Sequence, residues 1–218
     1  MGISERRERE KTERRKAIIA SAKELILQHG VENVSIDDIA KKAEFSKSTV
    51  YMYFPNKEIL FTEICDEAAR AFLEHSASFW SADISGMEAL KYFWQCYIEL
   101  FGNSKDILAI FQVRNFIYSS FSLDEQSRTE SVNEIIEKIK SIIEKCKSEG
   151  VFSPDLDPDT ATRLLLSIFS LMVENATQTH KEQNPKTETV TEELSNYFQI
   201  MIRGFAKEGT QHSYLNIL

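Results

Sequence analysis

The sequence predicts an all-α protein. Glycine and proline, which interrupt helices and mark turns, are scarce: the 218 residues include 7 Gly and 4 Pro. Apolar residues recur at three- and four-residue intervals through most of the chain, without the strict alternation typical of strands. Hydrophobic residues make up 42% of the chain and aromatic residues 11%. This composition provides a substantial core for helices to share.

The first predicted helix runs from about Glu13 to His29. Gly30 follows it at the position where glycine commonly ends a helix. Its apolar stripe is Ile18, Ile19, Ala22, Leu25 and Ile26. Residues 1–12 interleave basic and acidic side chains. They fit either a frayed extension of this helix or a flexible basic arm that enters a minor groove.

Residues 35–57 predict two short helices joined by a tight turn, followed by the start of a third helix. Ser35 and Asp38 form the capping-box pattern at the first of them. Ser46 caps the second helix, which runs to Phe54 before Pro55 stops it. Val50 and Phe54 lie four residues apart, so both can face the first short helix.

The opposite face of the second short helix mixes hydroxyls, a cation and aromatic rings. This mixture is unusual for a solvated surface and suits a DNA groove, where hydroxyls and Lys meet phosphates and a few side chains touch base edges. Partial burial of Tyr51 and simple packing of Met52 are the alternatives for those two residues. The face consists of Lys47, Ser48, Thr49, Tyr51, Met52 and Tyr53.

This stretch resembles the helix-turn-helix of TetR-family transcriptional regulators. The family usually has Gly where this chain has Glu44, so the turn is expected to carry a cost or to be built differently. The resemblance implies a helix-turn-helix DNA-binding domain in residues 1–56 and a helical ligand-binding and dimerisation domain in residues 57–218. The matching residues are Ser35, Ile39, Ala40, Ala43, Phe45, Ser46, Lys47, Thr49, Val50, Tyr51, Tyr53, Phe54, Asn56, Lys57, Glu58 and Leu60.

The expected DNA contacts divide into two groups. Lys47, Ser48, Tyr51 and Met52 are the candidates for base edges. Thr49, Tyr53 and Lys57 are the candidates for phosphates, with Ser35 a weaker one because capping occupies its hydroxyl. The resemblance places Lys57 beside a phosphate at the start of the fourth helix, where free N–H groups also favour an anion.

Six further helices are expected, over about residues 57–80, 85–101, 105–118, 123–149, 157–180 and 188–206. A second capping box starts at Ser85, with Glu88 as its acid. Gly150 ends the long amphipathic helix before it. Asp157 and Pro158 form a cap followed by proline at the first helical position.

The resemblance implies a repressor that leaves its palindromic operator when a small hydrophobic or aromatic molecule binds. The side chains expected to line the pocket are Phe93, Trp94, Tyr97, Phe111, Asn115, Phe116 and Phe169, although each could be ordinary core. The last two helices are the expected homodimer interface, although they could simply close the core of one chain. The interface candidates are Leu165, Phe169, Met172, Tyr197, Phe198 and Met201.

Other classes of protein fit less well. The histidines are scattered, and the chain has neither an HExxH motif nor a glycine-rich phosphate loop, so an enzyme, a metal site and a cofactor are not expected. The three cysteines lack metal spacing and are expected to be reduced thiols. The net charge of −8 arises after residue 60, because the first 60 residues are slightly basic. A cytoplasmic protein with no membrane contact is expected, and a helical dimeric scaffold without DNA-reading activity is the alternative.

Overall fold

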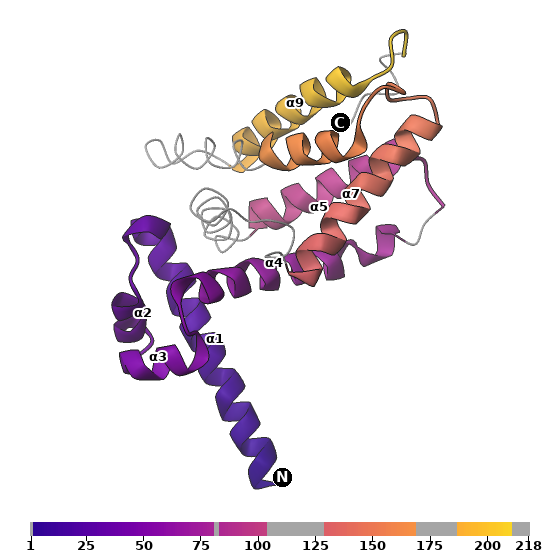
Figure 1. Ribbon diagram of the computed structural model, residues 1–218. Helices are drawn as coiled ribbons and strands as arrows, with labels where there is room; N and C mark the ends of the chain where they lie inside the picture. The colour runs from indigo at the N-terminus through magenta and orange to yellow at the C-terminus, as the bar shows by residue number, and fades with distance from the viewer. Residues whose placement is uncertain (1, 81–82, 104–128, 169–186, 211–218) are drawn as a thin grey trace. The chain divides into compact units, whose positions relative to one another are not determined.

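The computed structural model describes residues 2–80, 83–103, 129–168 and 187–210, and these residues contain helices and no β-strand (Figure 1). This confirms the predicted all-α class. Residues 158–168 are also helical. The other helices are α1 (Ile3–His29), the 3-10 helix η1 (Val31–Asn33), α2 (Ile36–Lys42), α3 (Lys47–Tyr53), α4 (Lys57–Trp80), α5 (Gly86–Asn103), α7 (Glu130–Ser148) and α9 (Thr187–Phe205).

The described residues pack as two units. The first comprises residues 2–68, and the second comprises residues 69–103, 129–168 and 187–210. The packing boundary falls inside α4 because the first turns of this helix belong to the core of the first unit. The functional division expected after Asn56 stays a prediction.

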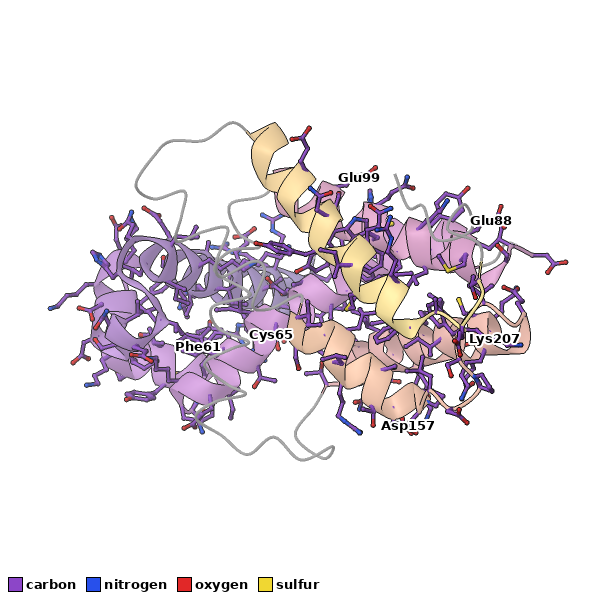
Figure 2. The ribbon with its side chains drawn as sticks, turned by 90° about the horizontal axis from the view of Figure 1, so that it is seen from above. Phe61, Cys65, Glu88, Glu99, Asp157 and Lys207 are labelled. Atoms are coloured by element: carbon purple, nitrogen blue, oxygen red, sulfur yellow. The ribbon has the colours of Figure 1, made fainter. Side chains whose placement is uncertain are left out.

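One apolar core holds the first unit together. Helices α1, α2 and α3 and the start of α4 all contribute to it, as their apolar spacing predicts. Its fully buried members are Ile18, Ala22, Ile26, Ile39, Val50, Phe54, Leu60, Phe61 and Ile64. In Figure 2, Phe61 and Cys65 are labelled along α4, and Cys65 is partly buried against this core.

Helix α1 is longer than the sequence indicates, because it begins at Ile3 rather than near Glu13. Two ion pairs at helical spacing support the extra turns: Arg6 with Glu10 at 2.9 Å and Arg9 with Glu13 at 3.4 Å. Such pairs stabilise a helix surface modestly. The interleaved charges of residues 3–12 therefore build a helical extension, which is one of the two alternatives that the sequence left open. Contact of these residues with DNA stays a prediction.

The second unit has an aromatic stack at its centre. The rings of Trp94 on α5 and Phe198 on α9 lie 4.3 Å apart and nearly parallel. Tyr97 stacks on the same indole at 5.5 Å. Trp94 and Phe198 are both almost fully buried. This stack joins α5 to α9 and makes the interior of the unit aromatic.

The start of α5 lies directly against the end of α7. The Ser85 backbone N–H and hydroxyl both donate to Glu88, at 2.9 and 2.7 Å, which confirms the second capping box. The Gly86 N–H donates to Glu149, 2.8 Å from its Oε2. A Cβ atom on Gly86 would lie only 2.7 Å from both the backbone nitrogen and the Sγ of Cys146. Glycine is therefore required here by the close approach of two backbones.

Helix α7 ends in a Schellman motif, in which two carbonyls of the last turn accept from residues beyond the helix. Gly150 has a φ of 75° and its N–H donates to Lys147 O, while the Val151 N–H donates to Cys146 O, both at 3.0 Å. The chain then forms an isolated antiparallel bridge between Phe152 and Ala206. This confirms Gly150 as the predicted end of the helix.

Two other predicted boundaries can be checked. The α7 helix begins at Glu130 rather than near Leu123, because Thr129 has an extended backbone and caps Val132. The predicted cap at Asp157 is confirmed, since its carboxylate accepts from the Thr160 N–H at 2.8 Å. The helix expected over 105–118 lies outside the described residues, as does the end of the helix expected over 157–180.

Candidate nucleic-acid interface

The two short helices begin with the predicted caps. The Asp38 N–H donates to Ser35 Oγ at 3.2 Å, and the Ser35 N–H donates to Asp38 Oδ2 at 3.1 Å. The Ser35 hydroxyl also donates to this carboxylate, and these bonds lower the pKa of Asp38. The hydroxyl of Ser35 is thus occupied within the cap, as the sequence analysis anticipates for a weaker phosphate candidate.

The turn between α2 and α3 is a second Schellman motif, with Glu44 at the left-handed position. Glu44 is the one described non-glycine residue with a positive φ, at 60°. Its N–H donates to Lys41 O at 3.2 Å, and the Phe45 N–H donates to Ala40 O at 2.9 Å. The turn therefore keeps the geometry that glycine would give, and Glu44 carries the steric cost of it.

Helix α3 begins in a cluster of hydroxyls. The Thr49 N–H donates to Ser46 Oγ at 3.1 Å, which confirms the predicted cap. The same Oγ lies 2.8 Å from the Ser48 hydroxyl and 2.7 Å from the Thr49 hydroxyl. Hydroxyls can donate and accept at once, so Ser48 and Thr49 keep capacity for a further partner.

The two faces of α3 differ sharply in exposure. Val50 and the following Phe54 are fully buried in the core of the first unit. On the other side the Met52 side chain is 83% exposed and the Tyr51 side chain 42%. The first unit thus holds α3 by one face and presents the predicted base-reading residues on the other. Tyr51 is thus partly covered, which is compatible with the alternative of partial burial, and its contact with DNA stays a prediction.

Lys47 starts the exposed face and pairs with α2. Its ammonium lies 2.8 Å from Asp37 Oδ1, and the contact raises the pKa of Lys47. Both side chains are about half exposed, so the pair contributes little to stability and can be exchanged for another anion. The partner Asp37 is not predictable from the sequence, since the ten-residue separation crosses a turn and matches no helical spacing.

Lys57 is held inside the first unit. Its ammonium donates to the Val31 carbonyl at 3.0 Å and lies 5.0 Å from the centre of the Phe61 ring. Burial lowers the pKa of Lys57, while the nearby Glu32 carboxylate opposes the shift. A phosphate would have to compete with the Val31 carbonyl for this cation. No short-range sequence signal connects Lys57 to Val31.

Asn56 and Tyr53 lie near the same end of α3. The Asn56 side chain accepts from the Ile59 N–H at 2.8 Å and so caps α4, as predicted. Tyr53 is half-buried against the core of the first unit. Of the predicted phosphate contacts, Thr49 and Tyr53 are therefore partly accessible and Ser35 is exposed but bonded.

The candidate residues of the second unit lie mostly in its interior. Phe93, Trp94 and Tyr97 are buried within the chain, where Phe93 also packs edge-on against Phe72 at 5.2 Å. The four other pocket candidates lie outside the described residues: Phe111, Asn115, Phe116 and Phe169. Whether the aromatic residues line a ligand pocket stays a prediction.

The predicted dimer residues divide in the same way. Leu165, Phe198 and Met201 are buried within the single chain, where they contribute to its own core. Tyr197 is 41% exposed. Phe169 and Met172 lie outside the described residues. Buried positions on these helices were predicted from apolar spacing, which does not distinguish the core of one chain from an interface.

The described residues contain no group of three or more His, Cys, Asp or Glu residues able to hold a metal ion. Burial raises the pKa of Cys96 to about 11 and that of Cys146 to about 12, which makes both poor nucleophiles. Within the same described ranges, no helix has the length and hydropathy to cross a membrane.

Residues 18–64, which include the whole helix-turn-helix, match the family described as bacterial regulatory proteins of the TetR family. This N-terminal region is therefore a helix-turn-helix of the TetR family. The relatives of the chain include an HTH-type transcriptional regulator of Bacillus subtilis, YhgD, which is 25% identical over 183 residues, covering 80% of this chain and 90% of the relative. The relatives of this chain are named as transcriptional regulators.

Solved structures of TetR-like proteins share the fold. The fatty acid degradation regulator FadR from Bacillus halodurans superimposes with a TM-score of 0.69 at 19% identity, covering 88% of this chain and 95% of that protein. AibR, solved in complex with isovaleryl coenzyme A and operator DNA, gives a TM-score of 0.60 at 21% identity, with coverage of 83% and 95%. At this level of identity the likeness establishes the fold.

Proposed function

We propose that this protein is a sequence-specific transcriptional repressor of the TetR family that reads DNA with the exposed face of α3. One observation carries the proposal: the helix is fixed by Val50 and Phe54 and presents Ser48, Tyr51 and Met52 outward together. A major groove admits an α-helix and displays base edges and thymine methyl groups. Tyr51 and Met52 are suited to apolar base contacts, and Ser48 and Lys47 to hydrogen bonds with base edges.

The phosphate contacts are assigned to groups around this face. Thr49 and Tyr53 bring hydroxyls at the two ends of α3. Lys47 can leave its exposed pair with Asp37 for a base or a phosphate, since solvent screening makes ion pairs between exposed side chains weak. Lys57 would contribute a cation at the start of α4 once it exchanges the Val31 carbonyl for a phosphate oxygen.

A homodimer would make one short reading helix sufficient. A two-fold pair could place two copies of α3 in successive major grooves about 34–36 Å apart on a palindromic operator. The support comes from exposed apolar side chains on the two helices expected to pair. Leu164 is 45% exposed, and Tyr197 and Ile200 on α9 are 41% and 66% exposed. Large apolar side chains on one surface favour association with a partner.

The proposed effector is a small hydrophobic molecule bound by the second unit. The aromatic interior around Trp94 supports an apolar ligand, and the structural likeness to a fatty acid degradation regulator and to an acyl-coenzyme A complex supports the class. Release from DNA requires that the effector bind the DNA-incompetent conformation more tightly. Helix α4 is continuous from Lys57 to Trp80, and we assign it the role of connecting effector binding to the position of α3.

The proposal is tested by selection of genomic DNA fragments on the purified protein, followed by sequencing. Wild type is expected to enrich one palindromic site, and Tyr51→Ala combined with Met52→Ala is expected to abolish the enrichment. Tyr92→Ala, which removes an exposed tyrosine of α5, is the matched control and should enrich the same site. A folded wild-type protein that enriches nothing at low salt would instead support a helical scaffold without DNA-reading activity.

A further inference from the structure

The first half of α1 packs against nothing described in the protein. Residues 4–14 are all exposed, whereas Ile18 and Ile19 are buried in the core. At 1.5 Å per residue, residues 3–14 form a helix about 18 Å long that projects from the first unit. An isolated helix of this length is marginal in water. Packing against other described residues therefore does not explain why residues 3–14 are helical.

The cations of this extension fall into two classes. Arg6 and Arg9 are each paired with a glutamate four residues later. Arg7, Lys11 and Arg14 form no ion pair with any described residue. Their spacings of four and three residues place the three unpaired cations in one stripe along the helix.

The acidic residues of the extension lie beside this stripe or bond other groups, and Glu10, which neighbours Arg7 and Arg14, is paired with Arg6. Glu10 and Glu13 neutralise the paired arginines, and Glu5 accepts from the Gly2 N–H at 2.9 Å. Glu8 lies about 60° around the helix from Lys11. The extension is thus nearly balanced in total charge but presents one uncompensated basic edge.

The position of the extension relative to α3 is fixed by Arg15. Its guanidinium lies 4.7 Å from the centre of the Phe54 ring, directly after α3, and pairs with Glu63 at 2.8 Å. From this point α1 continues past the level of α3, on the side away from α2 (Figure 1). Arg14, Lys11 and Arg7 continue the helical line that starts at buried Ile18, so the stripe lies on the side of α1 that faces the domain.

We propose that the helical extension of α1 is a second DNA-binding element, whose stripe of Arg7, Lys11 and Arg14 contacts phosphates outside the base pairs read by α3. This inference rests on the proposed function. The three cations span about 10 Å of helix, and duplex DNA carries one negative charge per about 1.7 Å of its axis. Residues 4–14 include no large apolar side chain, so a groove on another protein would have nothing to bury. The charge and the location of the stripe both favour the DNA backbone as its binding partner.

The decisive experiment compares two double variants that remove the same charge from the same helix. Arg7→Gln with Lys11→Gln removes unpaired cations, and Arg6→Gln with Arg9→Gln removes paired ones. Affinity for the selected operator is measured against salt concentration on a long duplex. Loss of two phosphate contacts should reduce the slope of log K against log salt by about 2 per protomer and weaken binding by about 10-fold or more in 0.1 M salt.

The control double variant should change the slope by less than half as much. A second test shortens the duplex to the base pairs under the two α3 helices. This should weaken the operator affinity of wild type and leave that of the Arg7/Lys11 variant unchanged. Circular dichroism checks that both variants keep their helix content. Equal slopes for the two variants, or no effect of duplex length, would overturn the inference while leaving operator binding intact. A wild-type protein without any specific site would overturn the proposed function as well.

Discussion

Helices α2 and α7 end in the same hydrogen-bond pattern but with different residues at the left-handed position. Glu44 holds this position after α2 with a φ of 60°, and Gly150 holds it after α7 with a φ of 75°. In both turns the next residue donates to the carbonyl five positions earlier, at 2.9 Å for Phe45 and 3.0 Å for Val151. The geometry of the turn is thus independent of the residue that occupies it.

The difference lies in what each turn costs and what it exposes. A left-handed conformation costs a residue with a Cβ about 1–2 kcal/mol, and glycine escapes that cost. Two hydrogen bonds and the packing of Phe45 against the core outweigh the cost at Glu44. The turn after α2 also places an exposed carboxylate just before the proposed reading helix. The turn before the proposed reading helix is therefore the less favourable of the two.

The largest expected effect on stability comes from Gly86, where the start of α5 lies against the end of α7. Gly86→Ala should lower the free energy of unfolding by about 1–3 kcal/mol, because the new methyl group would meet the backbone of Cys146. Gly204→Ala is the matched control, since a Cβ at this exposed position of α9 meets nothing within 4 Å. The control should raise stability by about 0.5–1 kcal/mol. Urea denaturation measures both, and similar values for the two would contradict the close-approach account.

Gly150→Ala measures the cost of a left-handed backbone conformation without a steric clash. A Cβ there would meet nothing within 4 Å, so only the positive φ opposes alanine. The variant should be about 1 kcal/mol less stable than wild type in urea denaturation. A loss below about 0.3 kcal/mol would mean that the turn after α7 relaxes, and that the two helix ends are not equivalent.

Glu44→Gly should show the opposite sign. Removing the Cβ relieves the left-handed strain. Glycine also increases the entropy of the unfolded chain, which offsets part of this stabilisation, so the free energy of unfolding should rise by about 0.5–1 kcal/mol. Glu44→Gln keeps the strain and removes the charge, and it should leave stability nearly unchanged. If glutamine reproduced the full gain, the cost at this turn would be electrostatic rather than conformational.

The smallest effect tests the cap at the other end of α2 through its pH dependence. The bonds from Ser35 hold the pKa of Asp38 below its ordinary value of 3.8. This stabilisation is present above the unfolded-state pKa and is lost as pH falls through the lower folded value. Asp38→Asn should therefore lower the Tm at pH 6 and have little effect near pH 2. An equal difference in Tm between wild type and variant at pH 6 and at pH 2 would show that the carboxylate charge does not stabilise the cap.

Local sequence rules predicted the helix ends well. Capping patterns correctly placed Ser35, Ser46, Asn56, Ser85 and Asp157, because a cap depends on residues three positions apart. The sequence left open whether residues 1–12 extend α1, since the extension lacks an apolar stripe and is supported by ion pairs within the helix. Contacts between distant positions, such as Lys57 with the Val31 carbonyl, leave no periodic signal.

Apolar spacing also could not separate core from interface. Leu165 and Phe198 were predicted at a dimer surface, and both are fully buried within one chain. The exposed residues Leu164 and Ile200 on the same helices were not among the interface candidates, although Leu164 belongs to the predicted apolar stripe of its helix. Periodicity identifies which residues leave water but not which surface covers them.

The central claim is that the exposed face of α3 reads bases, and one affinity ratio tests it most directly. The ratio compares the selected operator with a scrambled duplex of equal length, in wild type and in Tyr51→Ala. Loss of a base contact should reduce the ratio by about 5- to 150-fold, corresponding to about 1–3 kcal/mol, with an unchanged Tm and nearly unchanged binding to scrambled DNA. An unchanged ratio, or an equal loss on both duplexes, would contradict base reading by this face.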